Sequence, residues 1–302
     1  MEEQNKIVQD EKVSNEAVKR DAKTLWYSVR TFLSELLDIR SDTDRDSTIE
    51  AVKKDISFKG HNAWILIFSI FVASIGLNVS STAVVIGAML ISPLMGPIVG
   101  IGLSLAINDI ETLKRSLINL AVMIVLSVLT ATLYFAVSPI SELTPELEAR
   151  TYPTILDVLV AIFGGLALIV AKTKKGTIAS VIFGVAIATA LMPPLCTVGY
   201  GLAMGEWQYY AGAFYLFSIN AVFIALSTFL VAKFLRFPMV KYANSKRRRF
   251  VTQMASLIAL VVMIPSLYLF YILYKEQVFT SATKDYVTRV IRYEGAEVVK
   301  FS

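Results

Sequence analysis

Charged residues are scarce in this chain, and long stretches contain none. Asp, Glu, Lys and Arg make up 18% of its 302 residues, whereas hydrophobic residues make up 55% and the mean hydropathy is +0.61. A water-soluble core does not need so much apolar surface, so the composition indicates a multi-pass membrane protein. Residues 1–24 are polar and lack the apolar run of a secretory signal peptide, so we expect the internal spans to direct insertion.

Cysteine and histidine are almost absent, which removes several kinds of site. The one cysteine, Cys196, cannot form an intrachain disulfide, and the one histidine, His61, is expected at the mouth of the first span. The sequence shows no metal-ligand cluster, no Ser–His pair at membrane depth and no phosphate loop. An intramembrane aspartyl protease needs two facing carboxylates, but the span order puts Asp109 and Asp157 at opposite faces. We therefore expect no enzyme, no catalytic residue, no metal and no cofactor.

The positions of the charges divide the chain into about seven helical spans. No Asp, Glu, Lys or Arg occurs from Asn62 to Asn108. That stretch is too long for one helix, because about 20 residues cross the hydrocarbon core. The segment 76–81 is the natural turn within it. We expect an all-α, polytopic membrane protein with spans at 62–77, 82–107, 116–138, 154–171, 176–204, 209–232 and 250–274.

Basic residues gather in alternate loops and so predict an orientation. Lys and Arg in short loops favour the cytoplasmic side of a membrane. With a cytoplasmic N-terminus, the outer loops between the first six spans hold only Arg150. Seven spans then place the C-terminus outside the cytoplasm. The run 246–249 could bind nucleic acid or anionic lipid, but we interpret it as a topology anchor and expect no nucleic-acid partner. The basic residues of the inner loops are Lys114, Arg115, Lys172, Lys174, Lys175, Lys233, Arg236, Lys241, Lys246, Arg247, Arg248 and Arg249.

The spans and loops together predict the domain organisation. An amphipathic helix over 25–37 is expected to lie on the membrane or against another subunit, and in the second case we expect a homo-oligomer. Residues 42–54 are expected to form a solvated helix. The predicted regions are a cytoplasmic segment 1–60, a membrane domain 61–235 with units 61–138 and 154–235, a basic cytoplasmic loop 236–249, the seventh span 250–274, and an extracytoplasmic tail 275–302. The strand-like pattern at 286–301 suggests the start of a truncated soluble domain.

Two apolar segments carry nearly the same motif of Pro and Gly residues that can interrupt a helix. Leu94-Met95-Gly96-Pro97 aligns with Leu191-Met192-Pro193-Pro194, and Gly102 then aligns with Gly199. Pro and Gly persist within a membrane span where neighbouring helices or a wet cavity satisfy the freed backbone groups. The two spans run in opposite directions, so we expect a three-plus-three inverted repeat with broken second and fifth helices. The alternative is that Leu, Ala, Gly and Val make any two membrane helices look alike.

Three sequence stretches resemble a known family. They are VVIGAMLISPLMGPI at Val84–Ile98, ALMPPLCTVGYGLA at Ala190–Ala203, and GAFYLFSINAV at Gly212–Val222. The chain is similar over roughly residues 68–232 to the prokaryotic membrane family called domain of unknown function 389. The resemblance implies a multi-pass protein of the prokaryotic plasma (inner) membrane, often with a soluble domain at one end, and it implies no particular activity.

The residues expected at membrane depth are polar but neutral. Freed carbonyls coordinate cations and helix N-termini attract anions, so the breaks suit a small solute or ion. Buried carboxylates that would carry a proton are missing. For each hydroxyl the alternative is a bond to its own helix, and for each glycine close helix packing. We predict a transporter or channel, with a non-transporting sensor or scaffold as the alternative. The predicted pathway residues are Ser92, Pro93, Gly96, Pro97, Asn119, Thr189, Pro193, Pro194, Thr197 and Asn220.

Overall fold

The computed structural model of the chain falls into two compact units, residues 1–43 and 44–302. It describes residues 23–41, 43–139, 142–174, 180–240 and 270–286, with single positions between 250 and 268, and only the backbone of 180–190. In the first unit, residues 23–36 are helical, close to the expected range. The large apolar side chains of this helix are exposed, among them Trp26, Phe32 and Leu36. What covers them in the membrane or an oligomer stays a prediction.

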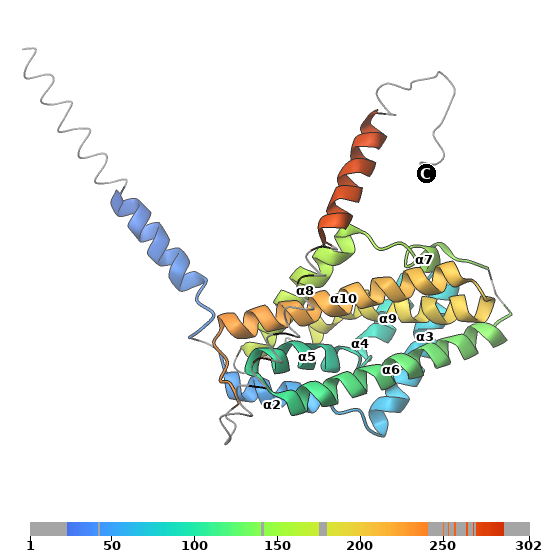
Figure 1. Ribbon diagram of the computed structural model, residues 1–302, viewed down its shortest axis with the longest axis horizontal. Helices are drawn as coiled ribbons and strands as arrows, with labels where there is room; N and C mark the ends of the chain where they lie inside the picture. Colours follow the sequence, from blue (N-terminus) through green and yellow to red (C-terminus); the bar gives the residue numbers. More distant parts are fainter. Residues whose placement is uncertain are drawn as a thin grey trace, which may run out of the picture. The chain divides into compact units, whose positions relative to one another are not determined.

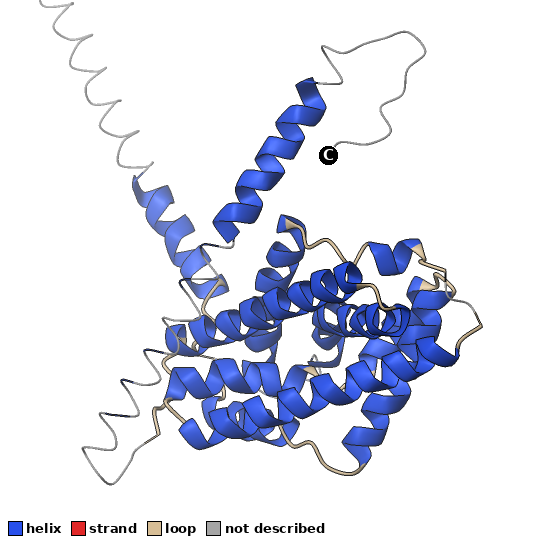
Figure 2. Ribbon diagram, turned by 45° about the vertical axis from the view of Figure 1, so that its right-hand side comes forward, coloured by secondary structure: helices blue, strands red, loops and turns tan. Residues whose placement is uncertain are grey.

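The second unit is a bundle of helices, as the composition predicts (Figures 1 and 2). Among the described residues, four helices are long and apolar enough to cross a membrane, and a bent pair makes a fifth candidate span. This confirms an all-helical membrane protein, while a total of seven spans stays a prediction. The elements are α2 (Arg45–Asp55), α3 (His61–Asn78), α4 (Thr82–Leu90), α5 (Met95–Ile107), α6 (Ile110–Val137), α7 (Pro145–Glu148), α8 (Ile155–Thr173), α9 (Ser180–Met204) and α10 (Trp207–Phe234).

The C-terminal part of the chain is described only in part. Most of the expected seventh span, 250–274, the basic run 246–249 and the strand-like pattern beyond Tyr286 lie outside the described residues. Residues 270–286 form a helix that continues past the expected end of the span at Tyr274. The first residues assigned to an extracytoplasmic tail are therefore helical.

Helix starts follow the capping residues in the sequence. Thr154 and Asp157 form a capping box at the start of α8, in which each side chain accepts a hydrogen bond from the other residue's backbone amide. The side chain of Asp109 accepts a hydrogen bond from the Thr112 amide and starts α6 six residues before the expected Ser116. The earlier start adds a charged first turn, because a cap sets where a helix begins and apolar content sets only which part of it can enter the bilayer.

The helix predicted over residues 82–107 is interrupted, as expected. α4 and α5 differ in direction by 54° across the break between Leu90 and Met95. Pro93 lacks an amide donor, and its ring disfavours helical geometry at Ser92. Pro97 lies in the first turn of α5, where amides have no intrahelical acceptor, so its missing donor costs no hydrogen bond there. The two prolines therefore end one helix and permit the next to begin.

The fifth span is not broken, and the prediction of a broken fifth helix is wrong. α9 continues as helix through Pro193 and Pro194. Every residue from 191 to 200 is buried, and α9 packs most extensively on α6 and α10 and also contacts α3, α4 and α8. Helices packed on several sides of α9 hold it in place although two amide donors are missing, as happens for other prolines within membrane bundles.

Contacts at one end of the bundle bring together the ends of several helices. Arg45 Nε donates a hydrogen bond to the Leu235 carbonyl just after α10, at 3.0 Å. The amide of Asp44 donates to the carbonyl of Thr173, the last residue of α8, at 2.9 Å. The Lys53 ammonium lies 2.8 Å from the carboxylate of Asp109, which precedes α6. We call this the basic end.

The opposite end gathers the other helix termini. Asn78, the last residue of α3, donates to the hydroxyl of Ser138, which follows α6, at 3.0 Å. Gln208 at the start of α10 donates to the phenol oxygen of Tyr152, which precedes α8, at 3.0 Å. α6 therefore runs away from the basic end, while α8 and α10 run toward it. With the bent pair α4–α5 counted as one, α3–α6 and α8–α10 are two three-helix units, and they run through the bundle in opposite senses.

Candidate functional site

The break between α4 and α5 lies partly open. Ser92, Pro93 and Gly96 are half-buried, whereas Leu94 is only 2% exposed. The Ser92 hydroxyl accepts a long hydrogen bond, 3.5 Å, from the Leu94 amide, and the Gly96 amide donates to the Pro93 carbonyl at 3.3 Å. The break is therefore a short polar turn between two apolar helices.

The C-terminal end of α2 packs directly against the start of α5. A Cβ atom added to Gly96 would overlap the carbonyl oxygen of Asp55. One added to Gly100 would come within 2.6 Å of the Ile56 side chain. Ile56 itself is only 4% exposed. The absence of a side chain at Gly96 is thus required by the close approach of another backbone.

α2 also ties the two three-helix units together. The Asp55 carboxylate lies 2.6 Å from the ammonium of Lys172 at the end of α8. On the other side, the Asn119 side-chain amide in α6 donates to the Ile56 carbonyl at 2.8 Å. Together with the Lys53–Asp109 ion pair, these bonds make α2 a strap across the basic end, and we refer to it as the strap below.

The ion pair of the strap with α6 lies beside a small polar cavity of about 150 Å³. Burial raises the pKa of Asp109, but hydrogen bonds from Lys53 and Thr112 and the charge of Lys53 lower it, with a net result below the ordinary value of 3.8. Asp109 is therefore ionised at neutral pH. Among the described residues no group of three or more His, Cys, Asp or Glu side chains is placed to hold a metal ion. The cavity is lined by Lys53, Ile56, Asp109, Glu111, Thr112 and Arg115.

The structure gathers only some of the predicted pathway residues. Gly96 and Asn119 meet at the end of the strap, next to the break residues Ser92, Pro93 and Pro97. Asn119 thus caps the end of α2, a structural role that its position within a span does not reveal.

The remaining predicted pathway residues lie on α9 and α10. Pro193, Pro194 and Thr197 are buried in α9, and Asn220 is buried in α10. The Thr197 hydroxyl donates to the Pro193 carbonyl of its own helix, at 3.1 Å. The side chain of Thr189 lies outside the described residues. α9 packs against both α4 and α10, so the two groups lie on neighbouring helices.

The sequence reasoning missed the strap. The segment 42–54 was expected to be solvated, yet Thr48, Val52 and Ile56 are buried. Their spacing of four residues places all three on one helical face, a signal that was present in the sequence. Lys53 and Asp55 flank that face and make the ion pairs.

Two aligned glycines make reciprocal contacts between the units. A Cβ atom on Gly102 of α5 would overlap the carbonyl oxygen of Ala225 in α10. One on Gly199 of α9 would overlap the side chain of Ala131 in α6. The second helix of each unit therefore packs closely against the third helix of the other. This swapped contact is what an inverted repeat would produce, and it supports that proposal.

Comparison with known proteins supports the family resemblance. The chain is 29% identical over 170 residues to "Uncharacterized protein MJ0678" of Methanocaldococcus jannaschii, which covers 56% of this chain and 52% of that protein. The chain thus spans about half the length of the curated relative that it matches. No solved structure matches the chain. Residues 89–226, which include the break, α5, α6, α8, α9 and most of α10, match the family described as "Domain of unknown function (DUF389)", so this part of the chain is similar to that domain.

Proposed function

We propose that this chain moves a small solute or an ion across the prokaryotic plasma membrane, with the basic end in the cytoplasm. The observation that carries the proposal is the half-buried break between α4 and α5. It lies in a bundle whose three-helix units, α3–α6 and α8–α10, run in opposite senses. Interrupted helices of this kind expose backbone groups that bind ions and small polar solutes. The proposal includes no catalytic step, no cofactor and no nucleic-acid partner.

The chemistry of the break suits a polar but uncharged pathway. Ser92 supplies a hydroxyl, and the start of α5 supplies amides with partial positive charge. The buried carboxylate of Asp109 lies at the basic end and is paired with Lys53, so it is not available as a proton carrier along the break. Because α9 is continuous, the pathway has one broken helix rather than two crossing breaks.

The strap covers one side of the break at the contact of Asp55 with Gly96. Passage of a solute therefore requires α2 to move away from α5, or the solute to pass beside it toward α4. The ion pairs Lys53–Asp109 and Asp55–Lys172 would hold the closed arrangement. In this proposal α2 is the gate at the basic end.

Flux measurements test the proposal. The purified chain is reconstituted in liposomes, and small anions, alkali cations and neutral solutes are screened against empty liposomes. Ser92→Leu fills the break with an apolar side chain and is expected to reduce flux at least tenfold. Ser218→Leu is the matched control, because Ser218 is half-buried like Ser92 but lies on α10, where its hydroxyl donates to the Phe214 carbonyl of its own helix. A substitution at Gly96 is unsuitable, since it displaces the strap as well.

A non-transporting sensor or scaffold is the second candidate, and the strap favours it. α2 bonds to the ends of α6, α8 and α10 and follows the N-terminal segment directly in the chain. A change in that segment would reach the membrane helices through α2. The absence of flux for every solute, with both serine variants folded, would support this candidate over transport. A homo-oligomer remains part of either proposal.

A further inference from the structure

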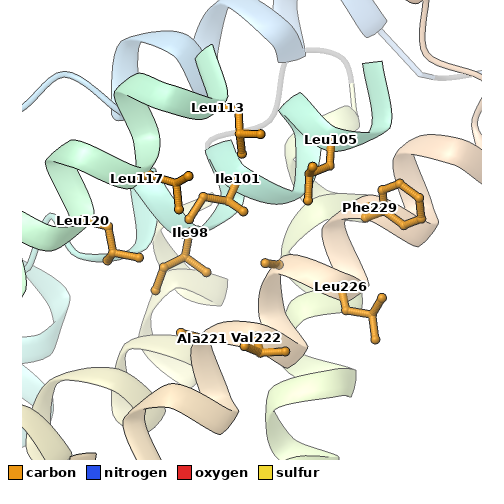
Figure 3. Close-up of a pocket in the computed structure, with 11 residues that line it drawn as sticks. Ile98, Ile101, Leu105, Leu113, Leu117, Leu120, Ala221, Val222, Leu226 and Phe229 are labelled. Carbon is orange, nitrogen blue, oxygen red and sulfur yellow. The ribbon is translucent and has the colours of Figure 1, made fainter. Parts of the chain in front are cut away.

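An apolar groove lies between α5, α6 and α10, and its lining on α5 begins at Ile98, one residue after Pro97. Its volume is about 250 Å³, slightly below the roughly 300–1,000 Å³ of typical small-molecule pockets. Figure 3 shows side chains of all three helices pointing into it, among them Ile98 and Leu105 of α5 and Phe229 of α10. Every lining residue is aliphatic or aromatic. The groove therefore offers no polar partner to a solute or an ion, and it is distinct from the proposed pathway.

The groove has a buried floor and an open mouth. Ile98 and Leu113 on its floor are buried, whereas Leu117 at its mouth is 50% exposed. Leu113, Leu117 and Leu120 follow one another along one face of α6, over roughly 10 Å at 1.5 Å per residue. A narrow apolar channel that opens sideways along membrane helices fits a flexible hydrocarbon chain.

Two lysines extend the walls of the groove toward the basic end. Lys233 lies four residues after Phe229 on α10, and its ammonium is 5.8 Å from the centre of the Phe229 ring. Lys114 lies three residues before Leu117 and on the same side of α6. Both lysines are exposed, and in the part of the chain that the structure describes neither makes an ion pair. Since α6 leaves the basic end and α10 approaches it, the two positive charges stand at the same end of the groove.

We propose that this groove binds an anionic phospholipid, with one acyl chain between α5, α6 and α10 and the phosphate held by Lys114 and Lys233. Apolar walls below a pair of unpaired cations are complementary to such a lipid and to no soluble anion, which would have nothing to place in the groove. Lysines near a membrane surface each strengthen the binding of anionic lipid by about a factor of five.

Native mass spectrometry of the full chain in detergent tests the proposal, with dioleoylphosphatidylglycerol and dioleoylphosphatidylcholine as probes. The wild-type chain is expected to retain the anionic lipid preferentially. The double variant Lys114→Gln/Lys233→Gln should lower its affinity for phosphatidylglycerol roughly 30-fold, with little change for phosphatidylcholine. Val222→Phe, which narrows the groove at a half-buried position, should weaken binding of both lipids.

Two control variants test whether the changes in lipid binding are specific to the groove. Lys54→Gln/Lys59→Gln removes two exposed lysines elsewhere, and Leu129→Phe enlarges a side chain of α6 that is 61% exposed outside the groove. Both should bind lipid as the wild type does. Equal affinity of the wild type for the two lipids, or unchanged lipid binding in both groove variants, would overturn the proposal. If Val222→Phe instead lowers the oligomeric mass or the melting temperature in lipid-free micelles, the groove is filled by a second copy or by the chain itself, and the proposal is also wrong.

Discussion

Single glycines decide how closely the helices of this bundle approach one another. Gly96 and Gly102 each lie where an added Cβ would overlap a carbonyl oxygen of a neighbouring element, whereas an added Cβ on Gly87 would meet nothing within 4 Å. Glycine thus occurs both in close backbone contacts, at Gly96 and Gly102, and next to open space, at Gly87. At Gly96 the reason is contact between two backbones, so the flexibility that glycine gives a chain is not what this position requires.

Substitution by alanine should change the stability of the fold differently at Gly96 and at Gly87. Gly96→Ala is expected to destabilise the fold by about 1–3 kcal/mol, the usual cost of forcing extra volume into a packed site. Gly87→Ala should be neutral or stabilise by up to about 1 kcal/mol, because alanine favours the helix and the space is open. Thermal unfolding in detergent measures both. Equal effects of the two variants would contradict the contact between Gly96 and Asp55.

The ion pair at Asp109 should make stability depend on pH. Its carboxyl pKa is lowered in the folded chain, so its contribution is fully present above the ordinary value of 3.8 and is lost as the pH falls through the lower folded value. Asp109→Asn should lower stability by about 1.5–3 kcal/mol at pH 7. This difference should shrink at pH 3 and below. Glu111→Gln is the control, because the Glu111 side chain is 76% exposed, and its loss should cost under about 1 kcal/mol.

Proline has opposite consequences in two helices of this chain. At Pro93 the chain turns by 54° between α4 and α5, while at Pro193 and Pro194 α9 stays helical. In the alignment of the two motifs Pro93 falls on Ala190, so the break lies at a proline that the α9 segment lacks, whereas the aligned Pro97 and Pro194 are both helical. α9 is enclosed by its neighbours over residues 191–200, whereas Ser92 and Pro93 are half-buried. The extra proline and the weaker enclosure of the α4–α5 segment both favour a break there, and only the proline can be read from the sequence.

The strap is the element whose detachment should be easiest to follow. Ile56→Ala removes a buried side chain that packs against Gly100, and it should cost about 2–5 kcal/mol. Amide hydrogen exchange should rise mainly in α2 and at the start of α5. Lys54→Ala, at an exposed position of the same helix, should leave exchange unchanged. A uniform rise across all helices would indicate that α2 is not a separate element of the bundle.

Across the whole molecule, local sequence signals predict where the helices lie, whereas long-range contacts determine how the helices are arranged. The charge-free stretches predicted α3 and α8 to within a few residues. The alignment of Gly102 with Gly199 predicted corresponding positions, and the structure gives them corresponding contacts. The role of Asn119 as a partner of Ile56 was not predictable, because it depends on where α2 lies relative to α6.

The placement of the basic end in the cytoplasm is tested by the accessibility of single cysteines. Lys174, just after α8, lies at the basic end, and Glu148, at the end of α7, belongs to the segment that joins α6 to α8 at the opposite end; both are exposed. Glu148 is preferable to its neighbour Glu146, which accepts a hydrogen bond from Thr82 and lies near Arg150.

In a Cys196→Ala background, an impermeant thiol reagent added to intact cells should label Glu148→Cys and leave Lys174→Cys unlabelled until the membrane is opened. The buried Cys196 should not react in the parent chain. Labelling of Lys174→Cys alone would reverse the orientation, because the positive charges would then face outward against the usual loop-charge bias. Labelling of both positions from outside would mean that α8 does not cross the membrane.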